Sequence, residues 1–207
     1  MTRFLETLRT QRWDDHRYYH HSLVNQSLHL LSAITFLCAY VLMFKDPAMA
    51  ALIAWLVAMT SRQTGHFFFE PRDYDVINQA TDEYKEAVKV GYNIKRKIVL
   101  MTVWALSPVV LLLNPTLFGM VATPRTWMQF ARHLGYLWLA VGVSGLLFRT
   151  VQLFFIRDAV TGLAWMTKIL TDPLNDAKLY CRAPLQLMRG GLIAPALSPD
   201  EQLEFHH

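Results

Sequence analysis

Four apolar runs divide the chain into segments of membrane-spanning length. They cover residues 24–44, 48–69, 98–113 and 134–156. Each is close to the ~20 residues that a helix needs to cross a ~30 Å hydrocarbon core. Lys45-Asp46-Pro47 predicts a tight turn after the first run, and Pro108 predicts a kink in the third. The pattern therefore predicts an all-α polytopic membrane bundle of about four transmembrane helices.

The segments outside these runs are amphipathic or polar. Residues 2–21 alternate apolar side chains with four arginines, which is typical of a helix in the headgroup layer, although a solvated helix is the alternative. Residues 82–86 predict a short helix outside the bilayer. We expect a membrane domain over 1–158 and a tail of interfacial or docked helices over 159–202. Residues 203–207 resemble the start of an affinity tag, so the last two histidines are left out of the chemistry.

Composition and charge support a membrane protein with short polar ends. The chain is 53% hydrophobic and 17% charged, with a formal net charge of +4. Lys and Arg gather in the N-terminal segment, in the loop before residue 98 and at Arg157, so both termini are expected in the cytoplasm. The charged residues 1–22 predict no cleavable signal peptide. Basic residues follow the run ends and form no aromatic-lined groove, so we expect no nucleic-acid partner. Cys38 and Cys181 have no zinc-type spacing.

Two histidines lie at similar depth on neighbouring runs. His29 lies about five residues, or ~7 Å, inside the cytoplasmic end of the first run, and His66 about three residues, or ~5 Å, inside that of the second. Ionisable side chains within lipid are costly and usually functional. A cation would hold converging imidazoles in their neutral form. The sequence thus predicts a metal site at the cytoplasmic face.

The remaining ligands are less clearly defined by spacing. His16, His20 and His21 reach the same face, whereas His133 falls on the opposite side. On one unbroken helix His21 joins the stripe of His29, whereas a break near residues 22–23 would turn His20 inward. Interfacial histidines without a metal are the alternative interpretation for any one of them.

Polar side chains near the histidines supply candidates for a supporting role. Glu70 follows His66 by four residues and shares its helix face, so it is a candidate ligand or catalytic group at the mouth of the site. Plausible hydrogen-bonding partners of the ligands are Tyr18, Tyr19, Asn25 and Gln63. Imidazole with carboxylate and no thiolate suits iron(II), manganese or zinc, and open positions suit oxygen chemistry on iron. The histidine boxes of the classical membrane desaturases are missing here, apart from the isolated His16-to-His20 spacing.

These residues resemble a known family. Tyr-Tyr-His-His at 18–21 with Asn25 and His29, followed by Gly65-His66 and Glu70, is similar to the fungal 2-hydroxy fatty acid dioxygenases and their bacterial relatives. The resemblance covers about a quarter of the chain. It implies an iron(II) enzyme of the endoplasmic reticulum or the bacterial inner membrane, which uses O2 to shorten 2-hydroxy fatty acids by one carbon (α-oxidation). It also implies His20, His29 and His66 as ligands.

The chain departs from the family pattern at three places. Ser22-Leu23 stands where Asp-Pro is frequent, Pro71-Arg72-Asp73-Tyr74 replaces a basic Pro-Ala segment, and the tail after Arg157 has no counterpart. These departures bear on the substrate more than on the metal.

A fatty-acid substrate leads to two further expectations. The acyl chain would lie between the helices against Phe67, Phe68, Phe69 and Trp104, although plain packing is the more ordinary role for these rings. Arg149, ~10 Å inside the fourth run, would clamp the anionic head, with snorkelling to the headgroups as the alternative. Two rival functions stay open: another metal-dependent lipid enzyme such as a hydroxylase, hydrolase or cyclase, and a non-catalytic lipid-binding or adaptor protein.

Overall fold

A computed structural model describes residues 2–70, 74–75 and 78–194 of the chain. Within these residues the structure is all-α, with two isolated β-bridges. The proposed tag remnant at 203–207 lies outside the described residues. The elements follow in the order α1 (Thr2–Tyr19), α2 (Leu23–Met43), α3 (Pro47–Ile53), η1 (Ala54–Met59), α4 (Thr60–Phe68), α5 (Asp82–Val88), α6 (Ile94–Leu113), α7 (Trp127–Ile156), α8 (Ala159–Leu179) and α9 (Ala183–Met188).

The first two apolar runs form an antiparallel helical pair. The Ser22 hydroxyl accepts from the Asn25 backbone N–H and caps α2, and the Asp46 carboxylate accepts from the Met49 N–H and caps α3. Helix then continues without a break from Pro47 to Phe68, but its centre, η1, is a π-helical segment. The second expected span is therefore helical throughout, and it is divided into three stretches.

Three helices, α2, α6 and α7, are long and apolar enough to cross a membrane. The helix α6 is continuous through Pro108 and ends at Leu113, and α7 begins earlier than expected, at Trp127. Many apolar side chains of α6 and α7 face outward, including Val99, Val103, Leu147 and Phe148. Such exposed apolar surface is what a lipid-facing helix requires.

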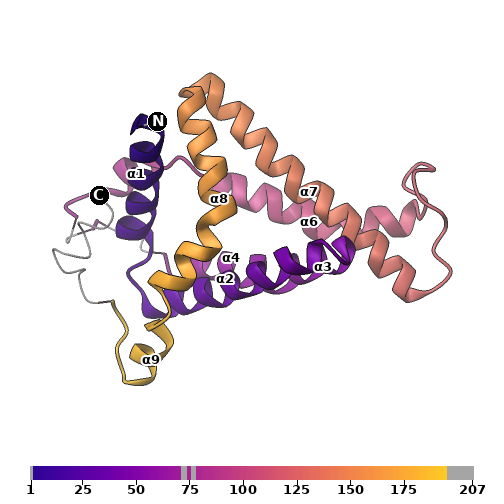
Figure 1. The fold of residues 1–207 in the computed structure, drawn as a ribbon, viewed down its shortest axis with the longest axis horizontal. Coiled ribbons are helices and arrows are strands. Elements are labelled where there is room, and N and C mark those ends of the chain that lie inside the picture. Colours follow the sequence, from indigo (N-terminus) through magenta and orange to yellow (C-terminus); the bar gives the residue numbers. More distant parts are fainter. Residues whose placement is uncertain (1, 71–73, 76–77, 195–207) are drawn as a thin grey trace.

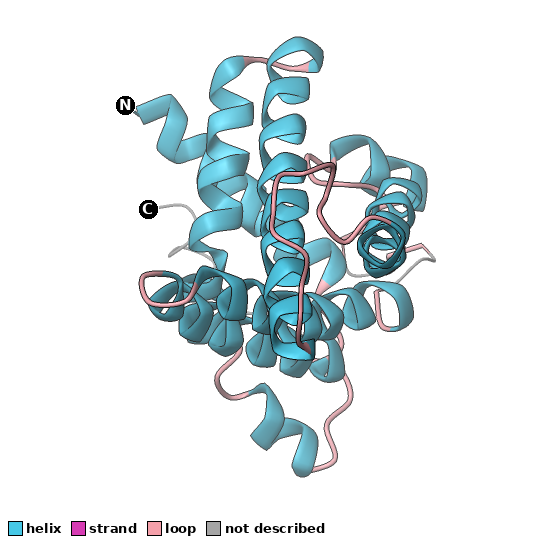
Figure 2. Cartoon of the chain, turned by 90° about the vertical axis from the view of Figure 1, so that its right-hand side faces the viewer, coloured by secondary structure: helices cyan, strands magenta, loops and turns pink. Residues whose placement is uncertain are grey.

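The helices form a wedge. In Figure 1, α2 and α3 lie along the base, α7 rises away from them, and α8 closes the open side, with α1 beside it. Residue contacts join α3 to α7, α7 to α8, and α8 to both α1 and α2. At the narrow end Gly135 of α7 lies directly against the backbone of Ala48, and Arg132 pairs with Asp46 at 2.6 Å. Figure 2 gives the view from this narrow side.

Helix α8 is packed more deeply than the tail was expected to be. The sequence pattern of the tail favours solvated surface for Asp172, Asp176 and Lys178, with a cap over the opening of the site as the alternative. In the structure Asp172 and Asp176 are buried, as is Lys168. Lys168 lies 2.8 Å from both Asp15 and Asp172. Burial raises the pKa of Asp172. Burial alone lowers the pKa of Lys168, yet the two carboxylates raise it overall, so the ammonium stays charged. These ion pairs allow a polar helix face to be buried.

Candidate metal centre

A break between α1 and α2 turns His20 inward. The helix α1 ends at Tyr19 and α2 begins after Ser22. The side chain of Asn25 donates to the Tyr19 carbonyl at 2.9 Å, and that of Gln26 donates to the His20 carbonyl at 2.7 Å. These two amides, both buried, satisfy the carbonyl groups that the break frees. The structure therefore adopts the second of the two arrangements that the sequence left open, in which His20 is the inward residue.

Gly65 allows the two histidine-bearing helices to come close together. A Cβ atom at this position would overlap the Asn25 side chain and approach His29 within 3.4 Å. Glycine has no Cβ, so α4 can lie directly on α2 at this level. As a result His66, the next residue, faces His29 across the helix pair.

Three buried imidazoles meet at this point. Ring centroids are 4.1 Å apart for His20 and His29, and 4.9 Å apart for His29 and His66. The remaining pair, His20 and His66, is 5.7 Å apart. One candidate ligand atom from each residue lies within 4.8 Å of the other two, so the group could hold a metal ion. The expectation that the histidines of the two helices meet is confirmed.

Each imidazole has an oxygen atom beside its Nδ1. The pairs are the Tyr180 hydroxyl with His20 (2.9 Å), the Asp176 carboxylate with His29 (3.6 Å) and the Glu70 carboxylate with His66 (3.5 Å). An acceptor beside Nδ1 favours the tautomer in which Nε2 carries the free lone pair. The Nε2 atoms of His20 and His29 are buried and have no hydrogen-bond partner among the described residues. The Nδ1 atoms of His29 and His66 also make no hydrogen bond there, although a carboxylate lies near each. Buried nitrogen atoms without a partner are unusual, and a cation between the two Nε2 atoms would satisfy both.

The neutral form that metal binding needs is favoured by burial. Burial lowers the pKa of His20 well below its ordinary value of 6.5. Burial also raises the pKa of the Tyr180 phenol well above 10, so the hydroxyl keeps its proton. If the neutral imidazole donates its Nδ1–H to the phenol oxygen, its Nε2 is available as a ligand.

The two alternate histidines are placed elsewhere. His16 lies on the other side of Tyr180, with its Nδ1 3.1 Å from the hydroxyl, and burial lowers its pKa to about 4. The His21 ring faces Asp75 at 3.4 Å. Neither belongs to the group of three ligands, nor does His133.

The predicted supporting residues are spread around the cluster. Glu70 is bound by the Lys89 ammonium at 3.1 Å, which places it as a neighbour of His66 outside the three-histidine group. The Tyr19 hydroxyl donates to the Lys85 carbonyl at 2.7 Å, so it fastens the 82–89 segment to α1. Gln63 lines the cavity described below. Tyr18 is buried beside Tyr19, away from the histidines.

Arg149 is not among the residues that gather at the histidines. Its guanidinium donates to the carbonyls of Val90 (2.6 Å) and Gly91 (3.2 Å) and to the Gln152 side chain (2.6 Å). These contacts tie α7 to the segment before α6 and occupy the donors that a head-group clamp would use. Neither of the two roles expected for Arg149, snorkelling to the headgroups and clamping an anionic head, includes these hydrogen bonds.

Asp176 and Tyr180 are the supporting residues that sequence reasoning missed. Together with Lys168 and Asp172 they recur every fourth residue, which puts all four on one face of α8. The stripe marks one polar helix face, but its periodicity does not show whether that face is buried, and solvated surface was the favoured interpretation of Asp172 and Asp176 over a cap on the site. Arg62 was also missed; it lies 2.9 Å from Asp176 and 3.5 Å from Asp172. Its charge fixes the carboxylate that faces His29.

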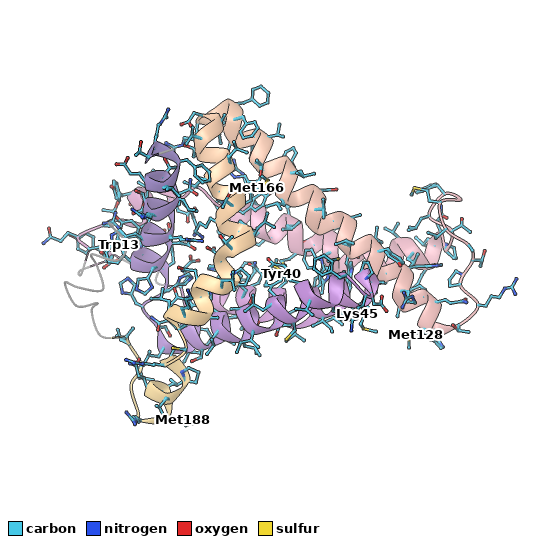
Figure 3. The ribbon with its side chains drawn as sticks, viewed as in Figure 1. Trp13, Tyr40, Lys45, Met128, Met166 and Met188 are labelled. Carbon is cyan, nitrogen blue, oxygen red and sulfur yellow. The ribbon has the colours of Figure 1, made fainter. Side chains whose placement is uncertain are left out.

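A cavity of about 410 Å³ opens beside the cluster. Its polar lining includes His66, Arg62 and Lys97 as well as the carboxylates of Asp14 and Asp15. Its apolar lining comes from α2, η1, α6 and α7 and includes Phe36, Trp55, Met101, Trp138 and Leu139. Tyr40, labelled in Figure 3, lines the same space and donates to the Leu170 carbonyl of α8.

The predicted lining by Phe67, Phe68, Phe69 and Trp104 is wrong. The Phe68 side chain is 77% exposed, because the last turn of α4 directs it outward. Trp104 stacks on the outer face of Trp55 at 5.7 Å, so Trp55 and not Trp104 meets the cavity.

Comparison of the chain with protein-family models, with curated proteins and with solved structures found no match. The resemblance to the 2-hydroxy fatty acid dioxygenases therefore stays a prediction, carried by the motif residues and by the site that they form. What the structure establishes is a buried group of three histidines that could hold a metal, in an all-α chain with three helices that could span a membrane.

Proposed function

We propose that the protein is a membrane-embedded, metal-dependent oxygenase acting on a single-chain lipid, with iron(II) as the metal and manganese or zinc as alternates. The observation that carries this proposal is the buried group of three histidines, one of which, His66, also lines an apolar cavity. A set of three imidazoles leaves coordination positions for substrate and O2. When bound, the iron supplies the activation of O2.

In this proposal the second helical run is a fourth crossing. It runs antiparallel to α2 over its whole length, and its π-helical centre interrupts the α-helix without ending it. With four crossings, the basic residues of α1, those of the 82–97 segment and Arg157 all lie on one side of the membrane. The distribution of positive charge makes this the cytoplasmic side. The metal site then lies just under the cytoplasmic leaflet, with both termini on that side.

The proposed substrate is a 2-hydroxy fatty acid, and the proposed reaction is its shortening by one carbon. The resemblance to the dioxygenase family supports the substrate, and an apolar cavity whose lining includes cations suits a fatty carboxylate. The reaction balances with one O2 per substrate: the C1–C2 bond breaks, C2 becomes the new carboxyl carbon, C1 leaves as CO2 and two hydrogens leave in water. The substrate itself supplies all four electrons, so no external reductant is needed.

The residues of the chain would divide this work. His20, His29 and His66 hold the metal, and their Nδ1 neighbours, Tyr180, Asp176 and Glu70, fix the ring orientations. Helix α8 covers the cluster, since His29 is fully buried, and so limits the access of water.

Oxygen labelling tests the proposal. Detergent-purified protein is analysed for metal and then given 2-hydroxyhexadecanoate under ¹⁸O2. We expect about one iron per chain and pentadecanoate that carries one labelled oxygen. Protein that contains no metal, or iron-containing protein that forms no labelled acid, would contradict the proposal.

A zinc-dependent lipid hydrolase is a second candidate. The observation that favours it is the all-nitrogen ligand set, since three histidines with an open fourth position form a recurrent catalytic zinc site. Zinc in the purified protein, together with cleavage of a lipid ester without O2, would select this candidate. A lipid-binding protein without catalysis would contain no stoichiometric metal.

A further inference from the structure

The charged residues around the cavity are almost all engaged in ion pairs. Those that line it are Asp14, Asp15, Arg62, Lys89, Lys97 and Lys168. Asp14 pairs with Arg17, Asp15 with Lys168, Arg62 with Asp172 and Asp176, and Lys89 with Glu70 and Glu86. Lys97 differs from all of them, because it makes neither an ion pair nor a hydrogen bond through its ammonium with any residue that the structure describes.

Lys97 nevertheless faces inward. Its neighbours Lys95 and Arg96 are exposed, whereas Lys97 is half-buried and lines the cavity together with His66. The opposite charge that acts on it most strongly is that of Glu70, but this carboxylate makes its own ion pair with Lys89. The ammonium of Lys97 is therefore a cation directed into a cavity with no anion of its own.

The same face of α6 leads from this cation into the apolar part of the cavity. Leu100 and Met101 follow Lys97 by three and four residues, so they share its helix face, and both line the cavity. Trp138 and Leu139 of α7 continue the apolar wall. A charged group at one end of an apolar wall matches an amphiphile with one anionic head and one hydrocarbon chain.

We propose that Lys97 binds the anionic head group of a single-chain amphiphile whose hydrocarbon chain lies along Met101, Trp138 and Leu139. The inference deepens the proposed function, on which it rests for the assumption that this cavity is the substrate site. It makes Lys97 a specificity-determining residue. Binding itself requires no metal, because no ligand of the metal takes part in the contact with the head group.

Ligand binding to metal-free protein tests this role. Full-length protein is stripped with a chelator in detergent, and binding of tritiated stearate is measured by scintillation proximity. Unlabelled stearate, octadecyl phosphate and octadecanol serve as competitors. We expect Lys97→Met to weaken binding of the acidic ligands at least about tenfold, the scale of one charge-assisted contact. Competition by octadecanol should change less than about twofold, since the alcohol has no charge for Lys97 to bind.

The matched control is Lys95→Met, which removes an exposed charge two residues away and should leave all three ligands unaffected. Lys97→Gln replaces Lys97→Met if gel filtration shows that the latter is misfolded. The stronger of the two acidic competitors identifies a carboxylate or a phosphate head. The inference would be overturned by a Lys97 variant that binds stearate as tightly as the wild type does. It would also be overturned if the variant weakened octadecanol binding as much as stearate binding. The outcome is independent of metal content and oxygen consumption, on which the proposed function is judged.

Discussion

The helix pair formed by α2 and the α3–η1–α4 run has two ends that are built differently. At the narrow end of the wedge, the indole N–H of Trp55 donates to the Trp138 carbonyl at 2.8 Å, and that of Trp138 donates to the Ser107 hydroxyl at 2.7 Å. At the wide end, the Nε2 atoms of His20 and His29 have no partner among the described residues. Trp55, Trp138, His20 and His29 are all buried, so burial alone does not explain the difference.

The polar groups at the two ends differ in kind. The indole N–H groups of Trp55 and Trp138 are hydrogen-bonded within the protein, whereas the indole N–H of Trp104, which packs against both, has no partner among the described residues. The histidine nitrogens are left open although Asp176, Tyr180 and Glu70 stand close enough to orient the rings. An indole N–H can only donate, whereas a neutral imidazole also has an acceptor nitrogen, so the histidine end could hold a cation.

Removing a histidine should have the largest effect. His29→Ala deletes the central imidazole of the group, and two ligands hold an ion far less tightly than three, so bound metal should fall from about one per chain to near zero. The measurement is elemental analysis after gel filtration. His133→Ala is the control and should keep its metal, because His133 is outside the three-histidine group and follows Arg132, which pairs with Asp46 at the narrow end of the wedge. If the His29→Ala and His133→Ala variants contained the same amount of metal, the assignment of the three histidines as a metal site would be wrong.

Glycine substitutions test whether the two ends respond differently. Gly65→Ala places a Cβ against Asn25 and should separate α2 from α4, which lowers metal affinity by more than about tenfold. Gly135→Ala places a Cβ against the Ala48 backbone, so it should lower the melting temperature and leave metal binding intact. Thermal unfolding and metal titration give the two readouts.

Gly142→Ala is the control for both substitutions. Its Cβ would lie 3.6 Å from the Trp55 ring, an ordinary contact. It should therefore change neither the melting temperature nor metal affinity by much. If Gly65→Ala, like Gly135→Ala, lowers the melting temperature and leaves metal affinity unchanged, the close approach of α4 to α2 at the histidines has only a structural role.

Removing one orienting group should have a smaller effect. Tyr180→Phe deletes the hydroxyl 2.9 Å from His20 Nδ1 and frees the ring to rotate. Loss of such a partner typically weakens metal binding by about 10- to 100-fold, and we expect the lower figure because Asp176 and Glu70 remain. Competition with a chromogenic chelator measures the affinity. Tyr40→Phe, whose hydroxyl bonds the Leu170 carbonyl, should keep the wild-type affinity.

The smallest effect is expected at the tryptophan end. Trp138→Phe removes one indole N–H and its hydrogen bond to Ser107, which should cost about 1 kcal/mol together with some loss of packing. The melting temperature should fall by a few degrees, and metal content should stay unchanged. A loss of metal in this variant would show that the two ends are coupled, contrary to the comparison drawn above.

Much of this arrangement could be predicted from the sequence, because hydrophobic length and histidine position are local signals. The apolar runs predicted α2, α6 and α7 to within a few residues at most ends, and the depth argument placed His29 beside His66. The break between α1 and α2, which directs His20 inward, was only one of two possibilities in the sequence. It depends on the side-chain amides of Asn25 and Gln26, which bind the carbonyl groups of Tyr19 and His20.

The contribution of α8 could not be predicted in the same way. A stripe of Lys168, Asp172, Asp176 and Tyr180 has the same periodicity whether it faces water or the protein. Its burial depends on Asp15 and Arg62, which lie more than a hundred residues away in the sequence. Pairings of this kind are set by tertiary packing, and single-sequence patterns carry no information on them.

The position of α8 also bears on how the protein is made. His20 and His29 emerge early in synthesis, but the groups that orient them, Tyr180 and Asp176, come from the other end of the chain. The histidine cluster therefore gains these two neighbours only after α8 has left the ribosome. Metal acquisition would then be a late step of maturation, and chains truncated before residue 176 should accumulate in the apo form.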